Sequence, residues 1–203
     1  MTIPRTAQAA AEAWTSPGPE LSWATLSHEA KRERILYAAG RVFAADGLDA
    51  PMPAVAAAAG VGVASVYRQY PSKADLLAAL VNERLQQIRD AAIAAAARGV
   101  DRWTALTEML WMLVERQSAD DFLGEAWQRV GDHATVADAS CHAIEAIGRL
   151  VVEAQEEGTV RDDATAADIR LLFAATRAAR SVDPVGWRRM LTLLIDGLRA
   201  PGR

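Results

Sequence analysis

The chain has 203 residues, of which 51% are hydrophobic and 24% charged, an ordinary composition for a globular protein. Its net charge of −4 excludes general binding of nucleic acid over the whole surface, and its one cysteine excludes an intrachain disulfide. No apolar run is long enough to cross a bilayer and no signal-peptide pattern is present, so we expect a cytoplasmic protein.

The first 26 residues are predicted to form a flexible tail. They contain Pro4, Pro17, Gly18 and Pro19 but no sustained apolar period, which is typical of mobile chain ends. We therefore expect the folded part of the chain to begin near residue 27.

The first helix is predicted to start at Ser27, a good N-cap, and to stop at Asp46-Gly47. It opens the most basic part of the chain. Between Lys31 and Lys73 there are six basic and three acidic residues, a charge of +3 that leaves −7 for the remainder. A basic segment on an acidic body suits a protein in which only that segment contacts phosphate.

Two short helices joined by a glycine turn follow, over residues 53–59 and 63–70. A helix-turn-helix needs a small residue at the closest packing point, a turn former, and a branched apolar residue on the second helix. Ala56, Gly60 and Val66 occupy these three places, at offsets of four and six. Such an element places its second helix in the major groove of DNA, so the segment indicates a class of partner.

The remainder is predicted to be helical throughout. Pro71 ends the preceding helix and Ser72 caps a long helix over residues 73–97. Further helices are expected near 102–117, 121–131, 135–157, 165–180 and 184–199. No segment has strand periodicity, so the predicted fold is all-α with about nine helices.

The motif region resembles the tetracycline-repressor (TetR) family of bacterial transcription regulators from about Arg34 to Leu77. The matching residues are Phe43, Gly47, Ala56, Ala59-Gly60-Val61, Val66-Tyr67, Tyr70 and Ser72-Lys73-Ala74-Asp75-Leu76-Leu77. The resemblance implies a three-helix DNA-binding domain over residues 27–73. It also implies a larger helical domain for ligand binding and dimerisation over residues 74–203.

The resemblance also implies which residues contact DNA. Arg68 is the one long basic side chain on the second short helix and the best candidate to contact a guanine edge. Lys73 would contact phosphate together with the amides of its helix, and Arg32, with Lys31 and Arg34, would reach flanking phosphates. The other expected DNA contacts are Gly62, Val63, Ala64, Ser65, Tyr67 and Gln69. Tyr70, in contrast, is interpreted as a packing residue.

Two positions depart from the family pattern. Position 63 often carries a polar or basic residue in the family, and here it is Val63. The first short helix often begins with a phosphate-binding threonine, whereas the segment Ala50-Pro51-Met52-Pro53 has no hydroxyl. Both departures weaken backbone anchoring, so we expect modest affinity with strong salt dependence, or a contribution from the tail.

Bulky apolar residues are concentrated between positions 103 and 142, which suggests a hydrophobic ligand cavity. The predicted lining is Trp103, Met109, Trp111, Met112, Phe122, Trp127, His133 and His142, with Glu108, Gln117 and Gln128 as further polar groups. Ordinary core packing is the alternative for any one of these residues. The family resemblance favours a cavity somewhere in this domain.

One group of side chains has the residue types of a metal or catalytic site: His133, Asp138, Cys141, His142 and Glu145. No metal-binding spacing such as His-Glu-x-x-His or Cys-x-x-Cys is present. We therefore expect no metal, no cofactor and no enzymatic activity, and we interpret Cys141 as a small buried hydrophobe.

The last two predicted helices are apolar over more than one face. In the family resemblance they form a four-helix interface with a second copy, and the expected interface residues are Leu171, Leu172, Ala175, Trp187, Leu191, Leu194, Ile195 and Leu198. Burial against the chain's own body is the alternative, and both can hold. A homodimer would present two recognition helices to a pseudo-palindromic operator.

The sequence therefore predicts a homodimeric DNA-binding regulator, a repressor released from its operator by a small hydrophobic molecule. The long helix over residues 73–97 is the expected lever between the two domains. Two alternatives remain at this stage: a dimeric helical adaptor that has lost DNA binding, and a helical enzyme that uses the cavity.

Overall fold

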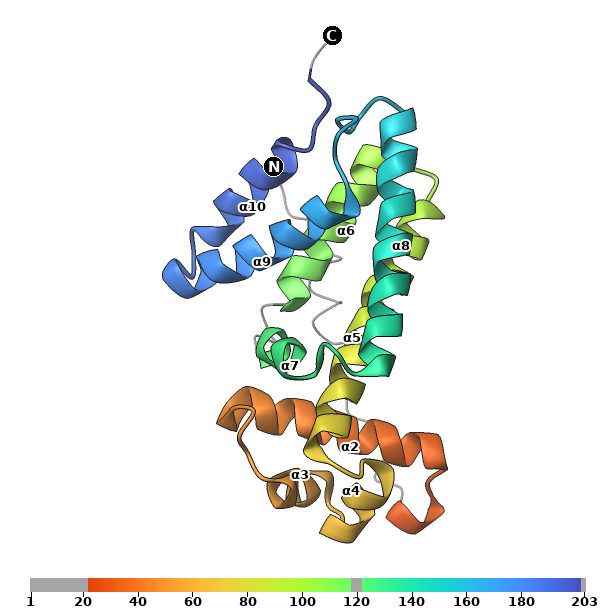
Figure 1. The fold of residues 1–203 in the computed structure, drawn as a ribbon, viewed down its shortest axis with the longest axis vertical. Coiled ribbons are helices and arrows are strands. Elements are labelled where there is room, and N and C mark those ends of the chain that lie inside the picture. The colour runs from red at the N-terminus through yellow and green to blue at the C-terminus, as the bar shows by residue number, and fades with distance from the viewer. Residues whose placement is uncertain (1–21, 118–121, 202–203) are drawn as a thin grey trace. The chain divides into compact units, whose positions relative to one another are not determined.

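The computed structural model describes residues 22–117 and 122–201, and the regular elements in these segments are helical (Figure 1). A 3-10 turn, η1 (Trp23–Thr25), precedes nine α-helices within the described residues. They are α2 (His28–Asp46), α3 (Met52–Ala59), α4 (Val63–Gln69), α5 (Lys73–Ala96), α6 (Arg102–Gln117), α7 (Phe122–Val130), α8 (Ala134–Glu156), α9 (Ala166–Val182) and α10 (Trp187–Asp196). The predicted all-α fold class is confirmed.

The described residues divide into two compact units. The first comprises residues 22–84 and 122–137, and the second comprises residues 85–117 and 138–201. Helices α5 and α8 each contribute residues to both units. The domain limits at residues 26 and 73 stay predictions, because compactness does not by itself define a domain that folds alone. Residues 1–21 of the predicted tail lie outside the described residues.

Helix α2 begins and ends at the residues that the sequence indicated. The Ser27 hydroxyl accepts a hydrogen bond from the Ala30 amide at 3.1 Å, so Ser27 is the N-cap. Gly47 ends the helix with a φ of 78°, a backbone conformation that side chains with a Cβ rarely adopt. Its N–H donates to the Phe43 carbonyl at 3.1 Å.

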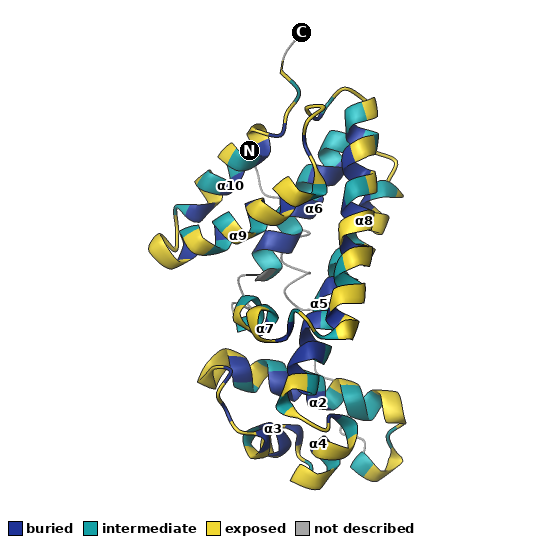
Figure 2. Ribbon diagram, viewed as in Figure 1, coloured by how far each residue is buried: buried dark blue, intermediate teal, exposed yellow. Residues whose placement is uncertain are grey.

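The core of the first unit forms where α2, α3 and α4 pack against one another. Ile35 and Phe43 of α2 are 0% and 1% exposed, and Val55 of α3 is fully buried. Figure 2 shows that α2 and α3 each carry both buried and exposed residues. Ala56 and Val66, the predicted packing positions of the helix-turn-helix, are buried, which confirms that both residues pack inside this motif.

The second unit has its own apolar core, built from the end of α5 together with α6, α8, α9 and α10. Its most buried members include Leu106, Leu110, Leu150, Ile169 and Leu191. Among the residues that the structure describes, no helix is both long enough and apolar enough to cross a membrane.

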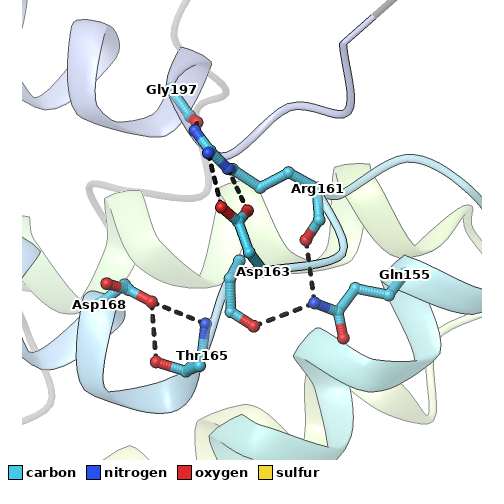
Figure 3. A network of polar contacts seen from close by, with 7 residues as sticks. Gln155, Arg161, Asp163, Thr165, Asp168 and Gly197 are labelled. Carbon is cyan, nitrogen blue, oxygen red and sulfur yellow. Dashed lines mark hydrogen bonds and ion pairs between the residues drawn. The ribbon is translucent and has the colours of Figure 1, made fainter.

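Polar contacts fix the connection between α8 and α9 (Figure 3). The Gln155 amide donates to the carbonyls of Arg161 and Ala164, each at 2.9 Å. Thr165 is the N-cap of α9 in a capping box, where the Asp168 carboxylate accepts hydrogen bonds from the Thr165 hydroxyl and N–H at 2.7 and 2.8 Å. These bonds satisfy backbone groups in a turn and hold the start of α9 in place.

Candidate nucleic-acid interface

The turn between α3 and α4 is held by backbone geometry and by one arginine. Gly60 has a φ of 67° and a ψ of 36°, the left-handed conformation, and its N–H donates to Ala57 at 3.1 Å. The Arg34 Nε atom donates to the Ala59 carbonyl at 2.8 Å. Arg34 therefore supports the turn from α2. From the sequence, Arg34 was expected to contact phosphate. The sequence does not show that the Ala59 carbonyl lies within hydrogen-bond distance of this side chain.

Helix α4 has one buried side and one exposed side. Val66 is fully buried and Tyr70, just after the helix, is 2% exposed, which confirms the packing interpretation of Tyr70. The exposed residues recur one turn apart and form two adjacent rows: Val63 with Tyr67, and Ala64 with Arg68. We call these four residues the outer face of α4.

Arg68 is the one cation on the outer face. Its Nη2 atom donates to the Ser65 hydroxyl at 3.3 Å, and its Nε atom donates to the Ala64 carbonyl at 3.4 Å. Both contacts are long and exposed, so the guanidinium can exchange them for a base edge at small cost.

The remaining predicted DNA contacts lie around this face. Gly62 is exposed and is the N-cap of α4, while Ser65 is half-buried. Gln69 is half-buried with its Oε1 atom turned inward, where it has no hydrogen-bond partner among the described residues. The amide of Gln69 is thus less available than the sequence suggested.

Four cations lie over aromatic rings in the described part of the first unit, and one of them is Arg41, 5.9 Å from the centre of the Tyr37 ring. The Arg32 guanidinium is 4.9 Å from the centre of the Tyr70 ring, and the Lys73 ammonium is 5.7 Å from that of Phe43. The Lys31 ammonium is 5.7 Å from the Trp23 ring. Stacking of this kind orients a cation without neutralising it, so the positive charge is retained.

Helix α7 belongs to the first unit although it follows α4 by more than fifty residues in the sequence. The rings of Phe122 and Phe43 lie 6.3 Å apart, and the Arg129 Nη1 atom lies 2.8 Å from the Asp49 carboxylate. The Arg129 hydrogen bond lowers the pKa of Asp49 below its ordinary value. The sequence carried no signal for these contacts, because they join positions about eighty residues apart.

His133 makes a further contact in this unit. Its Nε2 atom lies 3.5 Å from one carboxylate oxygen of Asp75, and the other oxygen accepts a hydrogen bond from the Ser72 hydroxyl at 2.7 Å. The hydrogen bond from Ser72, followed by that from His133, lowers the pKa of the Asp75 carboxyl. Asp49 is therefore paired with a cation, which partly offsets its repulsion of an approaching phosphate, and the Asp75 carboxylate is held by hydrogen bonds.

Comparison with known protein families gives two matches. The model of bacterial regulatory proteins of the tetR family matches residues 35–80. A model of the C-terminal domain of SbtR-like transcriptional regulators matches residues 101–200. Comparison with curated protein sequences gives no match.

Solved structures show the same similarity. The TetR transcription regulatory protein from Mycobacterium vanbaalenii is 32% identical, with a TM-score of 0.62, over 84% of this chain and 95% of its own. SCO0520 from Streptomyces coelicolor is 26% identical, with a TM-score of 0.65, over 84% of this chain and 99% of its own.

The chain belongs to the TetR family. TetR-family members are DNA-binding transcription regulators and not enzymes, and they carry the helix-turn-helix that α3 and α4 form here. A third similar structure is entitled the molecular basis for control of antibiotic production by a bacterial hormone. It is 25% identical, with a TM-score of 0.66, over 86% of this chain and 100% of its own.

The residues predicted to line a ligand cavity of this TetR-family protein fall into two groups. Trp103, Met109, Trp111 and Met112 pack into or against the core of the second unit. Phe122, Trp127 and His133 belong to the first unit. His142 and Gln128 are exposed, Glu108 pairs with Arg98, and the Gln117 side chain lies outside the described residues. The predicted cavity residues thus belong to two different units.

The residues predicted for the TetR-type dimer interface also divide. Most are buried within the chain's own core: Leu172, Trp187, Leu191, Ile195 and Leu198 are each at most 8% exposed. Ala175 and Leu194 are half-buried, whereas Leu171 is 62% exposed. The sequence missed Leu193, which is 59% exposed, because both sides of α10 are apolar.

A groove of about 490 Å³ lies between α9, α10 and the segment before α9. Its apolar lining includes Leu171, Leu172, Ala175, Leu194 and Leu198. Arg161 and Asp163 form its polar side, where they pair with each other (Figure 3). Five of the residues predicted for the dimer interface thus surround one hollow.

The side chains with the residue types of a metal site do not form one in the described part of the chain. No group of three or more His, Cys, Asp or Glu residues there could hold a metal ion. The expectation that Cys141 is buried was wrong, since it lies on the exposed side of α8 beside His142.

Proposed function

We propose that this TetR-family protein is a homodimeric repressor that a small hydrophobic ligand releases from a pseudo-palindromic operator. The observation that carries the proposal is the outer face of α4, which is exposed on a helix whose other side is locked into the core by Val66 and Tyr70. A rigid helix with one free side is what insertion into a major groove requires.

The charges around α4 support operator binding. Arg68 is the candidate for a guanine edge, and Arg32 and Lys73 flank the helix as candidates for phosphate contacts. The pairing of Asp49 with Arg129 partly offsets a negative charge that would repel the DNA backbone.

The exposed apolar side of α9 and α10 supports a dimer. Leu171 and Leu193 are each more than half exposed, on helices that also supply buried core residues such as Leu191. A two-fold axis through this side would bury both residues against a second copy and would present two α4 helices to one operator.

The second unit is the proposed site of ligand binding. Trp103, Trp111 and Met112 are only partly buried against its core, so small shifts of these side chains would open space for an apolar molecule. The similar protein whose title names a bacterial hormone supports control by a small molecule.

Release would follow from a shift in population. A ligand that binds more tightly to a form in which the two α4 helices are wrongly spaced would lower operator occupancy. Since α5 and α8 run through both units, these two helices are the proposed levers. If every ligand that binds the second unit left operator affinity unchanged, the lever hypothesis would fail.

The test is binding of the purified protein to the DNA that flanks its own gene, titrated over a range of salt concentrations. We expect sequence-selective binding whose affinity falls steeply with salt, since phosphate contacts release counterions. We also expect Arg68→Ala to reduce operator affinity by about 1–3 kcal/mol. As a control, Arg149→Ala changes an exposed arginine of α8 and should leave affinity unchanged. Absence of binding would instead favour an adaptor, and equal selective binding by Arg68→Ala and wild type would overturn the guanine contact of Arg68.

A further inference from the structure

The outer face of α4 is mostly apolar. Val63 is 36% exposed and Tyr67 is 45% exposed, and between them and Arg68 lies the single methyl group of Ala64. Val66 and Tyr70 fill the buried side of this segment, whereas part of the Val63 side chain is left exposed. An exposed branched side chain at the start of a recognition helix needs another explanation.

The approach to Val63 is open. A Cβ atom added at the preceding residue, Gly62, would meet no atom within 4 Å. The side of α4 that begins with Val63 can therefore lie close to another surface, and in the proposed function that surface is the floor of the major groove.

Valine can recognise only one feature of the major groove. Its side chain neither donates nor accepts a hydrogen bond, so it cannot distinguish the polar edges of the bases. The C5-methyl group of thymine is the one apolar group that a base pair presents there. We propose that Val63 contacts the 5-methyl group of a thymine in each operator half-site, and so selects an A·T pair. The inference rests on the proposed binding of α4 to an operator.

The position of this thymine follows from helix geometry. Val63 and Arg68 are five residues apart, which is about 7.5 Å along an α-helix. Base pairs are stacked about 3.4 Å apart, so the thymine lies within about two to three base pairs of the guanine that Arg68 contacts. Valine at position 63 thus replaces a phosphate contact of the family pattern with a contact to a thymine methyl group.

The test begins with an operator recovered by selecting a random duplex library on the purified full-length protein. Each thymine of the half-site is then replaced singly by deoxyuridine, which retains base pairing and removes only the methyl group. We expect one position, close to the guanine, at which the Kd rises about fourfold, as burial of one methyl group implies. Replacement in both half-sites should raise the Kd about fifteenfold.

The variant Val63→Ala assigns the effect to this side chain. It should bind the thymine and uracil duplexes equally while it retains the requirement for guanine. The matched control is Ile93→Ala, an exposed aliphatic residue of α5 in the second unit, which should retain the fourfold difference. Thermal unfolding of each variant checks that the fold is intact.

The outcomes separate this inference from the proposed function. If selection yields no preferred sequence, operator binding itself fails and the inference fails with it. If an operator is found but every uracil duplex binds as well as its parent, the thymine contact is overturned and the regulator stands. Sensitivity to uracil that persists in Val63→Ala would also overturn the assignment to Val63.

Discussion

Two tyrosines three residues apart have opposite surroundings. Tyr67 is 45% exposed on the outer face of α4, whereas Tyr70 is 2% exposed beneath the Arg32 guanidinium. The Tyr70 hydroxyl is buried without a hydrogen-bond partner among the described residues. A polar atom in that position opposes folding, so the ring of Tyr70 must contribute through its packing.

Burial of Tyr70 predicts a loss of stability in alkali. Burial raises the pKa of Tyr70 to about 12, from the ordinary value of 10.0. Above pH 10 the unfolded chain ionises at this residue while the folded chain does not. The free energy of unfolding should therefore fall as the pH rises from 10 to 12, by about 2 kcal/mol. Urea denaturation across this range measures the effect.

The variant Tyr70→Phe isolates the contribution of this hydroxyl. It should remove that part of the alkaline decline and, at neutral pH, leave stability unchanged or raise it by about 1 kcal/mol. Tyr67→Phe, at an exposed position, should retain the decline. An equal decline in all three proteins would mean that Tyr70 ionises freely in the folded state.

At the scale of elements, the recognition helix depends on the turn before it. Helix α4 has only seven residues, too few to be stable alone, so the turn and the packing of Val66 must hold it. Gly60 supplies the left-handed conformation, and Arg34 bonds to the carbonyl just before it. Backbone and side chain thus fix the same turn from two sides.

Replacement of Gly60 by alanine should destabilise the protein. A left-handed residue with a Cβ costs about 1–2 kcal/mol, and the new Cβ would lie 3.0 Å from the Arg34 guanidinium. The matched control is Gly40→Ala, within α2, where a Cβ meets no atom within 4 Å. There alanine should stabilise the protein by about 0.5–1 kcal/mol. Denaturant unfolding measures the free energy of unfolding of both variants. An equal change in the two would contradict a requirement for the left-handed conformation at Gly60.

Helix α7 extends the first unit beyond the motif that defines it. Phe122 contributes a ring contact to Phe43, while Arg129 contributes an exposed ion pair with Asp49. Exposed pairs are worth about 0–1 kcal/mol, so the ring contact is the stronger restraint. Motion of α7 would therefore first displace Phe43 of α2, whose ring also lies under the Lys73 ammonium.

At the scale of the whole molecule, the proposed dimer predicts a specific sensitivity. The pair of changes Leu171→Asp and Leu193→Asp places charges on the exposed apolar side of α9 and α10. We expect a folded monomer in sedimentation experiments, with weakened operator binding, because a charge buried in an interface is costly. The protomer should retain its helicity, since neither side chain lies in its core.

The control for the dimer prediction is Val152→Asp. Val152 is 51% exposed, comparable to Leu193, but it lies on α8. This variant should remain dimeric. A double variant of Leu171 and Leu193 that stayed dimeric would place the interface elsewhere.

The sequence by itself determined the local features. Helix ends were predictable at Ser27, Gly47 and Gly60 because capping bonds and left-handed turns involve residues only a few positions apart. The helix-turn-helix was predictable for the same reason, since Ala56 and Val66 meet within one short motif. The family followed from these residues.

The tertiary structure decided everything that depends on contacts between distant residues. It showed that Arg34 supports a turn, that α7 belongs to the first unit, and that the predicted cavity residues fall into two groups. It also separated the buried Leu191 from the exposed Leu193 on one apolar helix. Periodicity shows that a helix has apolar sides, but only the packed chain shows which side its own core covers and which is left for a partner.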